Sequence, residues 1–253
     1  MKKAFTILIL LIILAGLFSY RVEIRNYWLE MTKPDLPEVV EYELVEKEMP
    51  KPEIKEKTGG AENKALPESY NLAVPFTPQA PLADWNETFK EACEEAAALI
   101  VHYYYQNKEF TPQLATEEII KMVDWQKNYF GGHYDLTAEE TKEMIQKYLS
   151  YERVEIIENP SVDEIKRQLI EKRPVIVPAA GRELGNPYFQ TPGPIYHMLV
   201  IKGYTKDKFI TNDPGTKRGE DFLYNYDTIM AAMHDWNATD INLGAKKVIV
   251  IYP

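Results

Sequence analysis

The fold is decided at Pro174-Val175-Ile176-Val177-Pro178-Ala179, a continuous apolar run that is typical of a buried strand. Ahead of this run, apolar residues recur at helical spacing and predict helices over residues 90–105, 116–128, 137–149 and 161–172. Beyond it, apolar runs predict strands at 197–203, 208–211 and 245–252, with one more helix at 227–233. Helices followed by strands in this order predict an α+β fold.

Composition excludes several classes of protein. The chain has 253 residues, 45% of them hydrophobic, so it is long enough for one or two domains with a sizeable core. A formal net charge of −10 without a basic stripe argues against a nucleic-acid partner. A single cysteine excludes an intramolecular disulfide, and the four histidines show no zinc-ligand spacing. We therefore expect no metal and no cofactor.

The N-terminus carries the pattern of a membrane-targeting helix. Lys2 and Lys3 precede an apolar run over residues 4–20, which as a helix would span roughly 25 Å. We expect an uncleaved anchor at residues 1–20, and a cleaved signal peptide is the alternative. The first interpretation predicts a membrane-anchored protein whose domain lies outside the cytoplasm, and the second predicts a secreted one.

Residues 21–70 differ in composition from the rest of the chain. They are rich in Glu, Lys and Pro and contain few large apolar residues, so they cannot bury enough surface to offset the entropy of ordering. We expect an extended, disordered tether here and a folded domain over residues 71–253. The sequence does not indicate an oligomeric state.

Cys93 opens a predicted helix, in Glu91-Ala92-Cys93-Glu94-Glu95-Ala96-Ala97. Unpaired backbone N–H groups at a helix N-terminus favour the thiolate over the thiol, which is the form that acts as a nucleophile. Glu94 and Glu95 suit the helix dipole but would raise the thiol pKa, so we expect both side chains to point away from the site.

Three further residues complete a possible thiol mechanism. His197 precedes an apolar strand, where a base can face a cleft while the strand is anchored in the core. Asp213 comes after the next strand, in a turn that a hairpin would return to His197. Gln79 is a candidate donor to an oxyanion, together with the Cys93 N–H. His133, in a glycine-rich loop, is the rival base.

With these residues in place, the chain resembles the C39-like cysteine peptidases of the papain-like superfamily over residues 72–253. The resemblance is carried by four segments in order: 74–81 (VPFTPQAP), 91–97 (EACEEAA), 196–204 (YHMLVIKGY) and 212–216 (NDPGT). It implies a papain-like fold, with a helical half packed on an antiparallel sheet. It also implies Cys93 as nucleophile, His197 as base, Asp213 as its orienter and Gln79 as oxyanion donor.

These observations predict an extracytoplasmic cysteine peptidase that hydrolyses peptide bonds in a peptide or protein substrate. Two alternatives use the same scaffold. One is an acyltransferase in which an amine replaces water, and the other is a non-catalytic module that binds peptide in its cleft.

Overall fold

The structure is a computed structural model that describes residues 27–28, 31, 35–42 and 65–253. It divides into two compact units, Met1–Leu36 and Pro37–Pro253. In the first unit Tyr27, Trp28 and Met31 are helical and exposed. The predicted anchor or signal helix at residues 1–20 lies outside the described residues. Within the described parts, no helix combines the length and the apolar character needed to cross a membrane.

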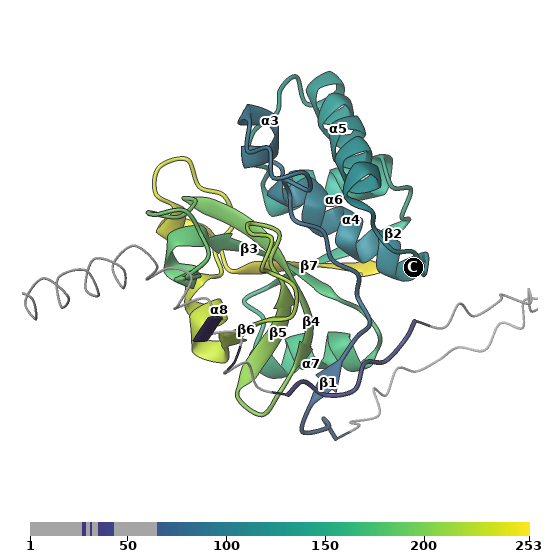
Figure 1. The fold of residues 1–253 in the computed structure, drawn as a ribbon, viewed down its shortest axis with the longest axis vertical. Coiled ribbons are helices and arrows are strands. Elements are labelled where there is room, and N and C mark those ends of the chain that lie inside the picture. The colour runs from purple at the N-terminus through teal and green to yellow at the C-terminus, as the bar shows by residue number, and fades with distance from the viewer. Residues whose placement is uncertain (1–26, 29–30, 32–34, 43–64) are drawn as a thin grey trace, which may run out of the picture. The chain divides into compact units, whose positions relative to one another are not determined.

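A seven-stranded antiparallel sheet forms the centre of the second unit (Figure 1). Strand β1 (Tyr70–Asn71) pairs with the C-terminal end of β4. The other six strands lie in the order β2 (Arg153–Glu158), β7 (Lys247–Tyr252), β3 (Val175–Ala180), β4 (Tyr196–Tyr204), β5 (Lys208–Asn212) and β6 (Phe222–Asn225). Strands β3 and β4 are buried along their whole length, which explains their continuous apolar runs.

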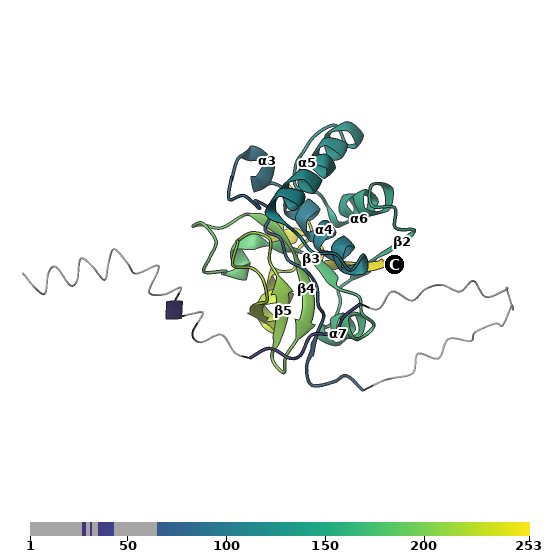
Figure 2. The same ribbon diagram turned by 45° about the vertical axis from the view of Figure 1, so that its right-hand side comes forward.

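Most helices precede the central strands in the chain. They are α3 (Glu87–Lys90), α4 (Cys93–Tyr105), α5 (Pro112–Tyr129), α6 (Ala138–Lys147), α7 (Val162–Ile170) and α8 (Tyr226–Ala232), with short 3-10 turns η1 (Gly181–Leu184) and η2 (Ile241–Leu243). Helix α4 packs on β4, and α6 packs on β2 and β7. Figures 1 and 2 show α3 to α6 as one cluster, separate from α7, and Figure 1 shows α8 apart from that cluster as well. The predicted α+β class with an antiparallel sheet is confirmed.

The predicted helix at 90–105 corresponds to α4, which begins three residues later, and a separate short helix, α3, ends at Lys90. Asn86 caps the short α3 by accepting hydrogen bonds from the N–H groups of Thr88 and Phe89. The backbone leaves the helical conformation at Ala92 (φ −109°, ψ 28°) and α4 then begins at Cys93. Cys93 is therefore the first residue of a helix that is almost entirely buried, and its N–H belongs to the helix-initial donors that have no acceptor within the helix.

Part of the expected tether lies against the domain. Val40 forms a parallel bridge with Leu72, and its N–H donates to the Asn71 carbonyl at 2.8 Å. The ring of Tyr42 packs on those of Tyr104 and Tyr105, with centroids 5.2 and 5.1 Å apart. Residues 37–42 thus belong to the folded unit, while residues 43–64 of the expected tether lie outside the described residues.

Candidate active site

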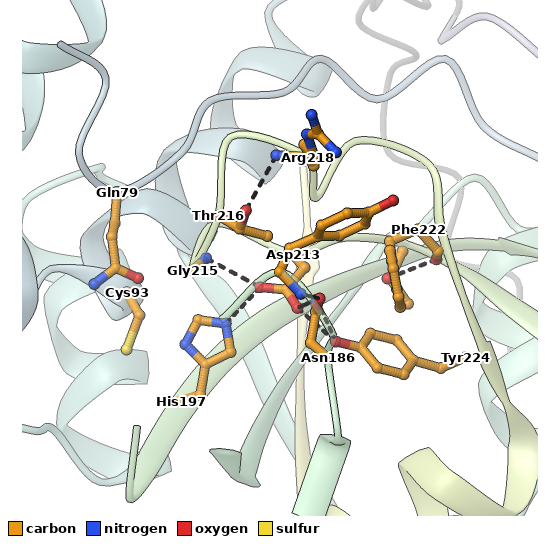
Figure 3. A network of polar contacts seen from close by, with 12 residues as sticks. Gln79, Cys93, Asn186, His197, Asp213, Gly215, Thr216, Arg218, Phe222 and Tyr224 are labelled. Carbon is orange, nitrogen blue, oxygen red and sulfur yellow. Dashed lines mark hydrogen bonds and ion pairs between the residues drawn. The ribbon is translucent and has the colours of Figure 1, made fainter. Parts of the chain in front are cut away.

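A cleft of about 670 Å³ brings together three of the four residues that the sequence singled out, Cys93, His197 and Gln79. This volume is in the usual range for a ligand site. Cys93 comes from the start of α4 and His197 from the start of β4. Figure 3 shows the two side chains next to each other, with Nδ1 of His197 on the side of Cys93. The fourth residue, Asp213, is fully buried behind His197.

His197 is held by Asp213 through its other ring nitrogen. The distance from Nε2 to Oδ1 of Asp213 is 2.7 Å, and both side chains are almost completely shielded from solvent. Because the carboxylate accepts from Nε2–H, Nδ1 is left to exchange a proton with a group in the cleft. The hairpin of β4 and β5 makes this pair, since Asp213 comes directly after β5, as the sequence predicted.

Asp213 receives four hydrogen bonds. Oδ1 accepts from His197 and from the Gly215 N–H at 3.0 Å, and Oδ2 accepts from Asn186 at 2.9 Å and Tyr224 at 2.6 Å. Burial by itself would raise the pKa of Asp213. The charge and hydrogen bond of His197, with the donors Tyr224 and Asn186, outweigh burial and hold the pKa below its ordinary value. The carboxylate is therefore ionised and fixed in place.

Two contacts fix the plane of the His197 ring. Phe189 lies edge-on to it, with ring centroids 5.3 Å apart and planes at 79°. Gly215 lies so close that a Cβ there would be 2.9 Å from Cε1 of His197 and 2.8 Å from the Phe189 ring. Only glycine fits this turn without moving the imidazole, which explains the glycine in the segment 212–216.

The side-chain amide of Gln79 does not point its N–H groups into the cleft, as an oxyanion donor would. Its backbone N–H donates to the Pro214 carbonyl at 2.9 Å, which joins the loop before α3 to the turn after Asp213. Its Nε2 donates to the carbonyls of Phe89 and Lys90, both at 2.9 Å. Both amide hydrogens are thus engaged, and the buried Oε1 has no hydrogen-bond partner in the structure. In this orientation Gln79 positions the segment before Cys93 and presents an acceptor rather than a donor.

Glu94 points toward the site, contrary to expectation. The Cys93 thiol donates to Oε2 of Glu94 at 3.1 Å, and Oε1 of Glu94 accepts from the Leu136 N–H at 2.9 Å. Burial, followed by the charges of Glu94 and Asp135, raises the pKa of the Cys93 thiol well above its ordinary value. The helix N-terminus therefore does not by itself produce a thiolate here, because burial and neighbouring carboxyl groups oppose it.

More acidic groups surround the thiol. Glu95 is fully buried, and its Oε1 lies 3.4 Å from Nε2 of His133. Burial lowers the pKa of His133, but the contact with Glu95 outweighs it and the net direction is upward. His133, the rival base of the sequence analysis, is not among the residues that line the cleft. Asp135 does line the cleft; burial, followed by its contact with Glu91, raises its pKa to about 7.

Three participants were not identified from the sequence. Asn186 and Tyr224 hold Asp213. Asn186 precedes a proline in a segment that has the usual composition of a turn, and Tyr224 lies in a strand of only four residues, so neither attracts notice in the sequence. Asp135 lies in the same glycine-rich loop as His133, and the sequence draws attention only to the histidine of that loop. In the described part of the chain, no group of three or more His, Cys, Asp or Glu side chains is arranged to hold a metal ion.

Comparison with known proteins gives two matches and one negative result. Residues 71–241 match the model of the Peptidase_C39 like family. A crystal structure from Bacillus anthracis, described as that of a C39-like peptidase, superimposes with a TM-score of 0.50 at 15% identity, covering 74% of this chain and 98% of the other. At that identity the likeness concerns the fold alone. No curated protein matches the sequence. The family model spans well over half of the chain, and the chain therefore belongs to the Peptidase_C39 like family.

Proposed function

We propose that this protein is a cysteine peptidase in which Cys93 attacks a peptide carbonyl and His197 moves the proton. The observation that carries the proposal is the pairing in the cleft. Nε2 of His197 is fixed by a buried carboxylate at 2.7 Å, and Nδ1 faces the cleft beside the sole cysteine of the chain. Nucleophile, base and orienter then stand in the order that acyl transfer requires.

The reaction would proceed in two halves. His197 takes the proton of the Cys93 thiol at Nδ1, and sulfur forms a bond to the substrate carbonyl carbon. The Cys93 N–H has no acceptor within α4 and would donate to the developing oxyanion. His197 returns the proton to the leaving amine as the peptide bond breaks, and water then hydrolyses the thioester. Asp213 keeps the imidazole in the required tautomer throughout.

In this mechanism Gln79 is a positioning residue. By donating to the Phe89 and Lys90 carbonyls, it fixes the backbone just before the nucleophile. A direct contact of its amide with the oxyanion would require the amide to turn and to release both carbonyls. The substrate class and the location in this proposal come from the sequence. The substrate is a peptide or a protein, and the apolar segment at residues 4–20 directs the domain out of the cytoplasm.

The test compares wild type with Cys93→Ala, in which no thiol remains. We expect wild type to cleave members of a fluorogenic peptide library and to react with an electrophilic thiol probe, and Cys93→Ala to do neither. Cleavage by Cys93→Ala at the wild-type rate would refute the proposal. Transfer of the acyl group to an added amine in preference to water would indicate an acyltransferase, and a wild-type thiol that stays inert at every pH would indicate a binding module.

A further inference from the structure

The contact between Glu94 and the nucleophile has no place in the proposed reaction. Glu94 is 0% exposed, and both of its carboxyl oxygens have defined partners. Oε2 contacts the Cys93 sulfur at 3.1 Å, and Oε1 is held by the Leu136 N–H at 2.9 Å. The carboxyl group is thus anchored by the loop between α5 and α6 and directed at the reacting atom.

We propose that Glu94 is a proton-operated gate on Cys93: below the high pH at which the thiol ionises even beside a charged carboxylate, the thiolate forms only while the Glu94 carboxyl carries a proton. The inference deepens the proposed function, because it concerns the ionisation of the same nucleophile. It assigns to Glu94 a direct contact with a reacting atom, and to the enzyme an activity that declines with rising pH as Glu94 ionises.

Protons are shared among Glu94, Cys93 and His197. When Glu94 is ionised, its carboxylate accepts the thiol hydrogen, and its negative charge opposes a second negative charge on sulfur 3.1 Å away. When Glu94 is protonated, its O–H can donate to the sulfur instead. The thiol proton then passes to Nδ1 of His197, and a thiolate, an imidazolium and a neutral carboxyl stand together. Removing one more proton leaves thiol, carboxylate and neutral imidazole as the favoured arrangement.

The groups that face Glu94 favour its protonated form. Glu95 lies beside it on α4 and Asp135 on the loop after α5, and the charges of both act on Glu94. Tyr196 on β4 is a neutral phenol whose own pKa is raised by burial, followed by the charges of Glu94 and Asp235. His197, beside the sulfur, becomes cationic when it takes the thiol proton, Lys90 and Lys217 also line the cleft, and His133 faces Glu95. Burial, followed by the charges of Glu95 and Asp135, raises the pKa of Glu94 well above its ordinary value. Glu94 therefore keeps its proton to a higher pH than an ordinary glutamate does.

The experiment is the pH dependence of Cys93 alkylation by iodoacetamide in the full chain, measured by mass spectrometry. Cys93 is the sole cysteine, so the signal belongs to one site. We expect the wild-type rate to rise with pH, pass through a maximum and fall, before rising again only as the isolated thiol ionises. In Glu94→Gln the fall should be absent, and on the alkaline side of the wild-type maximum the rate should exceed wild type by about tenfold or more, the factor for one pKa unit.

Glu95→Gln is the matched control. Glu95 is equally buried and lies in the same helical turn, but it contacts His133 rather than the sulfur. Its variant should keep the fall and move it to lower pH, because one charge that raises the pKa of Glu94 is removed.

Two results would overturn the inference. One is a wild-type alkylation rate that rises with pH to a plateau without falling, which needs no variant and so does not depend on how well Glu94→Gln folds. The other is a fall of unchanged size and position in a folded Glu94→Gln. Alkylation does not require peptide cleavage, so a bell-shaped profile in a protein that cleaves no peptide would retain the gate and reject the peptidase.

Discussion

The two sides of the cleft hold their carboxyl groups in opposite ways. The sheet side consists of His197 and Asp213 with the residues that hold them, and the helical side consists of the start of α4 with Gln79 and the loop that carries Asp135. On the sheet side, both oxygens of Asp213 receive two hydrogen bonds each, and the pKa of this carboxyl lies below its ordinary value. On the helical side, Glu94 and Asp135 have pKa values above the ordinary ones. Two buried acceptors there, Oε1 of Gln79 and Oε2 of Glu95, have no hydrogen-bond partner in the described structure, and Oε1 of Glu95 has only the 3.4 Å contact with Nε2 of His133.

The difference separates two tasks. A carboxylate with four donors has one stable protonation state and one position, so the sheet side fixes the geometry of the base. Carboxyls such as Glu94 and Asp135, which are buried near other acids, keep their protons to a higher pH than ordinary carboxyls do, so the helical side determines at which pH the nucleophile is available. Changes on the sheet side should therefore affect catalysis at every pH, and changes on the helical side should affect its pH dependence.

The largest effect should come from Asp213→Asn. The amide cannot accept from Nε2–H as the carboxylate does, so the imidazole would lose its fixed tautomer. We expect kcat for a cleaved peptide to fall by about 10⁴-fold across the neutral pH range, the scale on which loss of such an orienting carboxylate acts.

Asp235→Asn is the control for that variant. Asp235 is also buried and accepts from the Ala138 and Trp236 N–H groups, but it does not line the cleft. The Asp235→Asn substitution should lower thermal stability while leaving kcat within a few-fold of wild type. A kcat for Asp213→Asn that equals that of Asp235→Asn would mean that the sheet side does not orient the base.

A smaller effect is expected for Gln79→Ala, which removes the donors to the Phe89 and Lys90 carbonyls. Two buried acceptors left unpaired should cost about 2 kcal/mol or more, which is roughly 4–8 °C of Tm for a domain of this size. The resulting shift of the backbone before Cys93 should lower kcat by about 10²-fold. Calorimetry and steady-state kinetics measure the two quantities.

Asn71→Ala provides the comparison for Gln79→Ala. Asn71 is a buried amide that also donates to a backbone carbonyl, that of Pro37, and also has an unpaired oxygen, but it lies outside the cleft. It should lower Tm without lowering kcat. If Gln79→Ala instead lost kcat at an unchanged Tm, the amide would be free to serve the oxyanion directly, as the sequence predicted.

The sequence predicted those features that depend on local pattern. The change from helical to strand period at Pro174 separated the helices from β3, β4, β5 and β7, and the capping pair of Thr137 and Glu140 marked the start of α6. The strands β2 and β6 were missed, because β2 is only partly buried along an edge and β6 is short. Helix α5 begins a turn earlier than predicted, where Thr111 caps it and Pro112 occupies its first position.

For the site, residue type and order predicted which side chains meet but not which way each one points. His197 and Asp213 come together because one hairpin returns the chain, and a hairpin can be recognised from a sequence. The directions of Glu94 and Gln79 depend on contacts with Leu136, Phe89 and Lys90, which no local pattern encodes. Side-chain direction at a helix start is set by tertiary packing, and for this reason the predicted direction of Glu94 was wrong, while the role of Gln79 as oxyanion donor stays a prediction.

The smallest effect concerns the stability of the helical side. The pKa of Asp135 is raised to about 7 by burial and by its contact with Glu91, above the ordinary value of 3.8. The folded protein then binds this proton more tightly than the unfolded chain does. The contribution of Asp135 to stability is complete below the unfolded pKa and is lost as pH rises through the folded pKa of about 7. We expect the Tm of wild type to decline over this range and that of Asp135→Asn to decline less.

The exposed Asp84 supplies the control, because Asp84→Asn removes the same charge from a side chain on the surface. Its Tm should track the wild-type curve. The effect of pH on stability has the opposite sign for Asp213. Its lowered pKa adds stability above the pKa of the unfolded chain, and this stability is lost as pH falls through the pKa of the folded protein. Acid should therefore weaken the sheet side and alkali the helical side. If Asp135→Asn and wild type lose Tm in parallel through neutral pH and beyond it, the carboxyls of the helical side are not protonated near neutrality, and the division of tasks between the two sides is wrong.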